Sequence, residues 1–173
     1  MMKTFDYSLV KDSQYFKDGR MDAHSDHTYY RDGEEAQEKA TSFRYDLNGI
    51  WKFHYARNYG NTIKGFERED YSCKDWDDIR VPAHIQMEGY DAPQYANVQY
   101  PWEGHEDIHP GEIPEHFNPV ASYVKYFTVP EQMKGKRLFI SFQGAESGIA
   151  LWLNGQFVGY SEDSFTPSEF ELT

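Results

Sequence analysis

The sequence predicts an all-β fold, an antiparallel β-sandwich of the jelly-roll kind. Three features of its 173 residues predict this fold: short segments in which apolar and polar residues alternate, turn signals between these segments, and little helical periodicity. Aromatic residues make up 17% of the chain, and large flat side chains suit the pleated surface of a sheet. A mixed α+β domain is the alternative fold.

The first 45 residues predict an extended arm rather than a folded unit. They are polar and irregular, with turn signals at Asp18-Gly19 and Asp32-Gly33, and residues 33–40 are compatible with one or two turns of helix. Because an arm poor in aliphatic residues cannot fold alone, we expect it to lie on another surface. The predicted division is therefore an arm, residues 1–45, and a sandwich, residues 46–173.

The first strand of the sandwich is predicted directly after the turn dipeptide Asn48-Gly49. Aromatic and polar residues alternate along it, as is typical of a half-buried strand: Trp51, Lys52, Phe53, His54 and Tyr55. Residues 60–80 are polar, with Trp76 and Ile79 as apolar anchors and with Asp77 and Asp78 expected at the surface.

Residues 82–120 predict a long ordered loop. They contain most of the prolines of the chain: Pro82, Pro93, Pro101, Pro110, Pro114 and Pro119. Proline removes a backbone donor and fixes φ, so this segment does not fit the interior of a sheet. It is also rich in Tyr, Trp, His and Asn, and long ordered loops often carry function.

Strand signals return in the last third of the chain. Alternation predicts strands over residues 123–129, 138–142 and 149–153, and residues 157–161 are predicted as the return strand of a hairpin. Asn154-Gly155 supplies a two-residue hairpin turn, since both residues adopt positive φ at low cost. A further alternating segment starts at Phe170, and we expect at least one more strand beyond Thr173.

The composition excludes several classes of partner. The net charge is −12, from 17 basic and 29 acidic residues, so we expect neither nucleic acid nor an anionic membrane as a partner. The single Cys73 excludes an internal disulfide and fits a reducing compartment. Residues 1–10 lack the apolar region of a signal peptide, and no apolar run is long enough to span a bilayer. We therefore expect a cytoplasmic protein.

Two groups of residues have the side-chain types that a divalent metal takes. The larger group lies in the proline-rich loop: His105, Glu106, Asp107, His109, Glu112, Glu115 and His116. Its spacing matches no closed zinc pattern, and prolines interrupt any helical alignment, so we expect a solvated acidic loop. His24, Asp26 and His27 form a weaker group, and we predict no metal site in this chain.

Six segments, taken together and in order, resemble glycoside hydrolase family 2: residues 47–53, 81–90, 93–102, 118–123, 142–147 with 153–161, and 163–170. They are similar to its N-terminal sugar-binding domain, which implies a galactose-binding-like β-sandwich. Residues 93–102, PQYANVQYPW, resemble the P-x-Y-x-N-x-x-Y-P signature of the large bacterial β-galactosidases. One departure is Ile85, which stands where the family usually has Trp.

The resemblance implies a retaining β-galactosidase that hydrolyses terminal β-D-galactosides such as lactose, with this chain as its non-catalytic N-terminal domain. Its two catalytic glutamates would lie on a (β/α)₈ barrel of roughly 250 residues, for which this sequence has no room. No catalytic residue is therefore assigned here. The implied partners are the galactoside, the barrel of the same polypeptide and further copies in a homo-oligomer.

The resemblance also implies magnesium and sodium ions for the whole enzyme, with none held by this chain. The aspartate that binds sodium in the family would lie beyond Thr173.

Asn97 is the first candidate for substrate binding. The resemblance implies that it reaches into the active site of the barrel and binds galactosyl hydroxyls, and a neutral amide can both donate and accept. Val98 would follow it on the aglycone side, and Trp102 is a candidate stacking platform for sugar. The structural alternatives are an asparagine that caps a turn and a tryptophan that anchors the loop.

Two other functions fit the same segments. One is an independent carbohydrate-binding module. The other is a structural or subunit-contact domain of a related family 2 glycosidase, a β-glucuronidase or a β-mannosidase.

Overall fold

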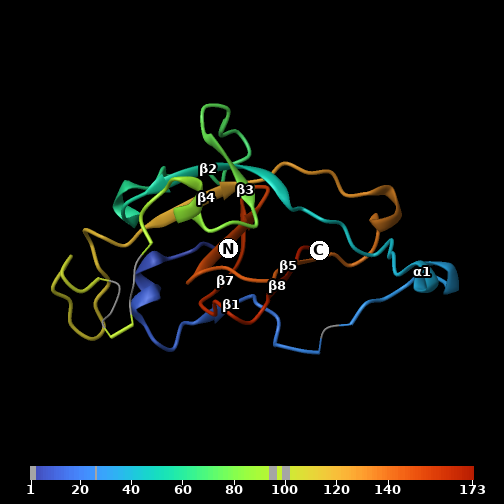
Figure 1. Ribbon diagram of the computed structural model, residues 1–173, viewed down its shortest axis with the longest axis horizontal. Coiled ribbons are helices and arrows are strands. Elements are labelled where there is room, and N and C mark those ends of the chain that lie inside the picture. The colour runs from blue at the N-terminus through green and yellow to red at the C-terminus, as the bar shows by residue number, and fades with distance from the viewer. Residues whose placement is uncertain (1–2, 26, 94–96, 99–101) are drawn as a thin grey trace. The chain divides into compact units, whose positions relative to one another are not determined.

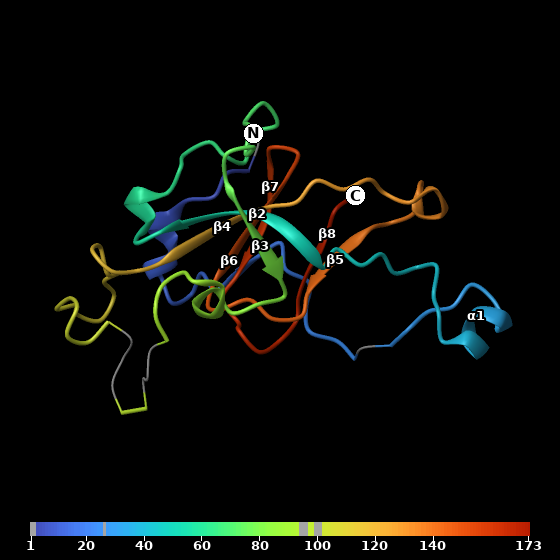
Figure 2. The same cartoon turned by 45° about the horizontal axis from the view of Figure 1, so that its top comes forward.

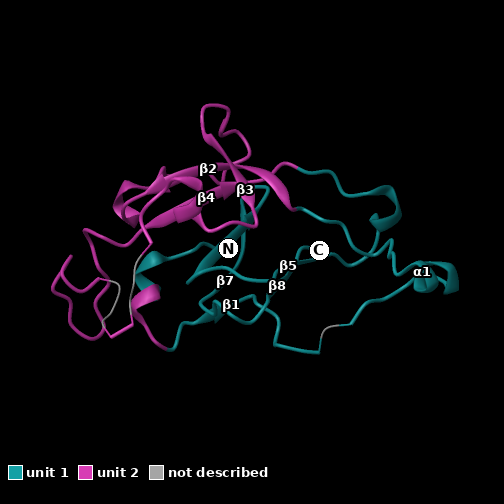
Figure 3. Cartoon of the chain, in the orientation of Figure 1, with its two compact units in different colours: residues 1–9, 14–47, 127–173 teal, residues 10–13, 48–126 magenta. Residues whose placement is uncertain are grey.

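The protein is built from antiparallel β-sheets with only short helices, which confirms the predicted all-β class (Figure 1). The computed structural model describes residues 3–25, 27–93, 97–98 and 102–173. Over these residues the chain forms eight strands and two compact units (Figure 3). The first unit contains residues 1–9, 14–47 and 127–173, and the second contains residues 10–13 and 48–126.

The second unit holds a three-stranded sheet in the order β3-β2-β4. These strands are β3 (Asp77–Val81), β2 (Gly49–Ala56) and β4 (Val120–Val124), and both partners run antiparallel to β2. Phe53 is 1% exposed, and its ring centroid lies 4.5 Å from that of Tyr90 and 5.0 Å from that of Tyr123. The aromatic residues of the predicted strand therefore form the core on one face of β2.

The opposite face of β2 is also covered, where we expected only one buried face. His54 contacts the buried Trp76 at 5.4 Å between ring centroids, and Phe66 and Tyr71 contact the same indole at 5.4 and 5.9 Å. The indole N–H donates to the Tyr71 hydroxyl at 3.2 Å. Residues 60–76 thus cover this face with rings, which local alternation along β2 does not show.

The first unit holds two sheets. One has the order β1-β7-β6, formed by β1 (Lys17–Asp18), β7 (Gln156–Ser161) and β6 (Ile149–Leu153). The other pairs β5 (Phe139–Phe142) with β8 (Ser168–Glu171). The predicted turn joins β6 to β7, with φ of 49° at Asn154 and 74° at Gly155. Phe170 of β8 is fully buried.

Part of the N-terminal arm joins this unit through β1. Lys17 pairs with Ser161 and Asp18 pairs with Tyr160, so Asp18 lies in strand β1 and Gly19 forms an isolated bridge to Tyr160, where we predicted a turn. The ring of Phe5 lies 5.4 Å from that of Tyr160. Pairing with β7 thus outweighs the local Asp-Gly signal, and the domain boundary at residue 45 stays a prediction.

The helices are short. They are η1 (Tyr7–Lys11), α1 (Gly33–Glu38), η2 (Tyr59–Asn61), η3 (Ile85–Glu88) and η4 (Glu131–Met133). Asp32 caps α1 by accepting the N–H groups of Glu34 and Glu35, and the helix ends at Lys39 with a left-handed φ of 54°. None of the helices formed by the described residues is long and apolar enough to cross a membrane.

Candidate functional site

The proline-rich loop, residues 82–119, belongs to the second unit; it leaves the sheet after β3 and returns to it at β4, as the green to yellow segment of Figure 2. Tyr90 anchors its beginning. The ring packs on Phe53 and stacks on Tyr55 at 6.3 Å, and the hydroxyl donates to Asp77 at 2.9 Å. Burial is the main cause that raises the pKa of Tyr90, and the hydrogen bond to Asp77 raises it further. The loop therefore starts from a fixed point on the sheet.

The end of the loop is tied to the residues that follow β2. The N–H of Asn118 donates to the carbonyl of Arg57 at 3.0 Å, and the side-chain amide of Asn58 reaches the carbonyl of His116 at 3.5 Å. The Arg57 guanidinium also lies 5.6 Å from the centre of the Phe117 ring. Both ends of the loop are thus held by the same sheet.

Glu106 connects two parts of the loop. Its carboxylate accepts the backbone N–H groups of Glu115, His116 and Phe117 at 2.7, 2.9 and 3.3 Å. These hydrogen bonds lower the pKa of Glu106 because they stabilise its charged form, and the bond from Glu115 has the largest effect. We expected a solvated acidic loop here, and Glu106 departs from that expectation.

Trp102 lies next to this connection. Its carbonyl accepts the N–H of His105 at 2.9 Å and the N–H of Glu106 at 3.2 Å, which closes a turn. The His105 ring stacks on Phe117 with 4.3 Å between centroids. Trp102 itself is half-buried. The structure therefore gives it the surroundings of a loop residue, and its role in stacking on sugar stays a prediction.

Asn97 and Val98 lie in the middle of the loop. Both are exposed, and Val98 keeps 92% of its surface accessible. Residues 94–96 and 99–101, which carry most of the signature segment, fall outside the described residues. The structure thus brings Trp102 and Glu106 together, while the substrate-binding roles of Asn97 and Val98 remain predictions.

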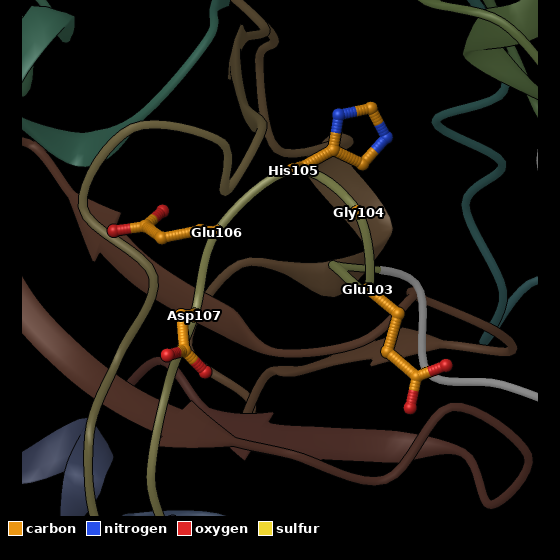
Figure 4. A pocket seen from close by; sticks show the side chains of 5 residues that line it. All are labelled: Glu103, Gly104, His105, Glu106 and Asp107. Carbon is orange, nitrogen blue, oxygen red and sulfur yellow. The ribbon is translucent and has the colours of Figure 1, made fainter.

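The side chains of the predicted acidic and histidine group do not converge on a common point. Residues 103–107 line a shallow depression, and Figure 4 shows Glu103, His105, Glu106 and Asp107 pointing in different directions around it. Over the described part of the chain, no three His, Cys, Asp or Glu side chains lie close enough to hold a metal ion. The described acidic and histidine side chains of this loop therefore do not form a cluster of three around one point.

The weaker histidine group belongs to the first unit. His24 lies 2.5 Å from a carboxylate oxygen of Glu169, and His27 contacts the hydroxyl of Tyr29. Asp26, the third predicted member, lies outside the described residues. These contacts are those of paired surface side chains.

A comparison with protein families places the fold and the loop in context. The model of the family described as "Glycosyl hydrolases family 2, sugar binding domain" matches residues 44–173. The chain belongs to this family. The match starts close to β2 and includes the whole proline-rich loop, so the anchors described above are features of a family 2 sugar-binding domain.

Curated relatives extend this family 2 match over nearly the whole chain. A protein named beta-galactosidase from Halalkalibacterium halodurans is 56% identical, over 99% of this chain and 17% of its own length. A beta-galactosidase from Streptococcus thermophilus is 47% identical over 96% of this chain and 16% of its own length. A beta-galactosidase large subunit from Latilactobacillus sakei is 42% identical over 91% of this chain and 27% of its own length. The chain thus spans only a minor part of the length of these relatives.

The sequence did not predict that Glu106 connects two parts of the loop. Glu106 was one of the seven residues of the predicted acidic and histidine group, with no feature that separated it from the others. Its three donors lie 9 to 11 positions further along the chain. No sequence periodicity marks such contacts between two parts of an irregular loop.

Proposed function

We propose that this chain is the non-catalytic N-terminal domain of a β-galactosidase that hydrolyses terminal β-D-galactosides, and that its proline-rich loop helps to bind the galactosyl unit. The observation that carries the proposal is the similarity to several proteins named beta-galactosidase. They are 56%, 47% and 46% identical over 95% or more of this chain. Such identity over a whole domain supports a shared role in the larger protein.

The proposal assigns the bond-breaking step to another part of the polypeptide. A retaining glycosidase needs two carboxyl groups about 5–5.5 Å apart on either side of the glycosidic bond. Barrel enzymes place such groups at the carboxyl ends of their strands, and a barrel needs roughly 250 residues. In this proposal the rest of the polypeptide also holds the magnesium and sodium ions, and no three His, Cys, Asp or Glu side chains among the described residues gather as a metal site would need.

Within this division of labour, the loop contributes selectivity for the sugar. Asn97 is exposed in a loop whose two ends are fixed on the sheet, so it can reach a neighbouring domain. Its amide can donate to one hydroxyl and accept from another. A sugar with a hydroxyl in the wrong orientation would leave buried polar groups unpaired, which costs about 1–3 kcal/mol for each group.

Substitution of Asn97 in the full-length enzyme tests the proposal. We expect Asn97→Ala to lower kcat/KM for lactose at least about tenfold, equivalent to about 1.4 kcal/mol of lost transition-state binding. Asn61→Ala is a matched control, because Asn61 is an exposed asparagine of the same unit that lies in η2, outside the loop segment. Unchanged kinetics for Asn97→Ala would refute the assignment.

Two further measurements separate the alternatives. Calorimetric titration of residues 1–173 with galactose or lactose should be silent if the loop only completes a pocket, whereas millimolar or tighter binding would support an independent binding module. In the full-length enzyme, nitrophenyl β-galactoside should be a far better substrate than the β-glucuronide or β-mannoside. The proposal also includes a homo-oligomer in the cytoplasm. Light scattering of the full-length enzyme would test the oligomeric state.

A further inference from the structure

Glu106 joins two parts of the loop that are distant in sequence. Its backbone N–H donates to the carbonyl of Trp102 at 3.2 Å. Its carboxylate accepts three consecutive N–H groups of the returning part of the loop, those of residues 115–117. One residue therefore connects the turn at Trp102 with the segment that leads back to β4.

The geometry of these contacts requires a charged acceptor. One carboxylate oxygen accepts from Glu115, and the other accepts from both His116 and Phe117. Hydrogen bonds to an ionised acceptor are roughly twice as strong as neutral ones, and a carboxylate has acceptor sites for all three donors. Glutamine offers only one oxygen, and its NH₂ group would have to face an N–H donor.

The returning segment is in turn fixed to the sheet. The Phe117 ring contacts the His105 ring at 4.3 Å and the Arg57 guanidinium at 5.6 Å. The next residue, Asn118, donates its N–H to the carbonyl of Arg57 at 3.0 Å. A continuous series of contacts therefore runs from the end of β2 through Phe117 and Glu106 to the turn at Trp102.

We propose that Glu106 is a positioning residue, whose carboxylate holds the loop at Trp102 in the conformation that receives a galactoside. This inference rests on the proposed function of the loop. Glu106 acts through Trp102 and the adjacent backbone, without touching the sugar. Because a loop that is ordered before binding loses less conformational entropy on binding, removal of the connection weakens substrate binding.

The test uses the full-length enzyme and three variants. Glu106→Ala removes every acceptor, and Glu106→Gln keeps one. Asp107→Asn is the matched control, because it removes the same charge from the adjacent residue, whose side chain makes no hydrogen bond or ion pair within the described residues. Each variant is measured for steady-state kinetics with lactose and for hydrogen exchange of the amides of residues 115–117.

We expect Glu106→Ala to speed exchange at these three amides and to raise KM about fivefold, which equals about 1 kcal/mol of binding free energy, with kcat little changed. Glu106→Gln should give a smaller change of the same kind, and Asp107→Asn should match the wild type. If Glu106→Ala unfolds the domain, the Glu106→Gln variant decides the outcome.

Two results would overturn the inference in different ways. Unchanged exchange in both Glu106 variants would show that the carboxylate does not hold the returning segment. Faster exchange with an unchanged KM would show that the connection exists but does not position a binding residue. Failure of the proposed function itself is recognised separately, because Asn97→Ala would then also leave the kinetics unchanged.

Discussion

Gly159 lies where β7 runs against β1, with no room for a side chain. A methyl group at this position would lie 2.6 and 2.7 Å from two ring carbons of Phe170, and closer still to the carbonyl oxygen of Asp18. Phe170 is fully buried and Asp18 belongs to the paired strand β1. Gly159→Ala therefore forces a buried ring, a strand backbone or both to move.

The cost of this movement can be estimated from overpacking in other cores. Extra methylene groups in well-packed interiors typically cost about 1–3 kcal/mol. We expect about 3 kcal/mol here, because two of the three close atoms belong to a fully buried ring and the third to backbone. This cost is a net value, in which the gain of about 0.8 kcal/mol from burying one methyl group is already included. For a chain of this size the melting temperature should fall by about 6–12 °C.

Urea and thermal unfolding of residues 1–173, followed by circular dichroism, measure this effect. Gly144→Ala is the matched control in the same unit, because its new methyl group would meet its nearest atom, the Ser164 carbonyl oxygen, at an ordinary 3.8 Å. We expect the control to lie within about 0.5 kcal/mol of the wild type. Equal midpoints for Gly159→Ala and Gly144→Ala would refute the packing argument.

Two further predictions concern the first unit. Hydrogen bonds from Thr166 and Phe165 lower the pKa of Asp163 to about 2, below its usual value of about 3.9, so its contribution to stability is present above pH ~3.9 and is lost as the pH falls through about 2. Asp163→Asn should remove this acid dependence from urea midpoints measured between pH 5 and 2, and an unchanged dependence would contradict it. Strand β5 pairs with β8 alone among the described strands, so its other edge has no partner strand there. Hydrogen bonds to β8 fall on every second residue of β5, which leaves the backbone N–H and C=O groups of Phe139 and Ser141 directed to that edge. An unpaired strand edge can pair with another chain, so we expect residues 1–173 to associate at high concentration. Ser141→Lys should reduce this association, because it adds a charge to the edge. A monomeric wild type in light scattering at high concentration would contradict the prediction.

Strands with a regular alternation were predictable because their signals are local. β2 and β6 follow the alternation of apolar residues, and Asn154-Gly155 determines the turn that joins β6 to its return strand β7. β3 was missed because Asp77 and Asp78, at its start, have low strand propensity, and pairing with β2 holds them in the sheet. β4 covers residues 120–124, earlier and shorter than the predicted 123–129, because pairing with β2 ends at Val124.

The candidate site divides in the same way. The signature around Asn97 and the prolines of the loop identified the segment and its family, because both are properties of residue order. The connection through Glu106 could not be identified, because it depends on which backbone groups the folded loop brings within 3.3 Å.

The sequence by itself determined the fold class, the family and the loop, since alternation, turn residues and ordered motifs are all local. The tertiary structure alone decided that Asp18 and Gly19 pair with β7, that β2 is covered on both faces and that one glutamate among several connects two parts of the loop. Each of these features depends on groups brought together from distant parts of the chain, and their hydrogen bonds and packing outweigh the local preferences of the residues concerned.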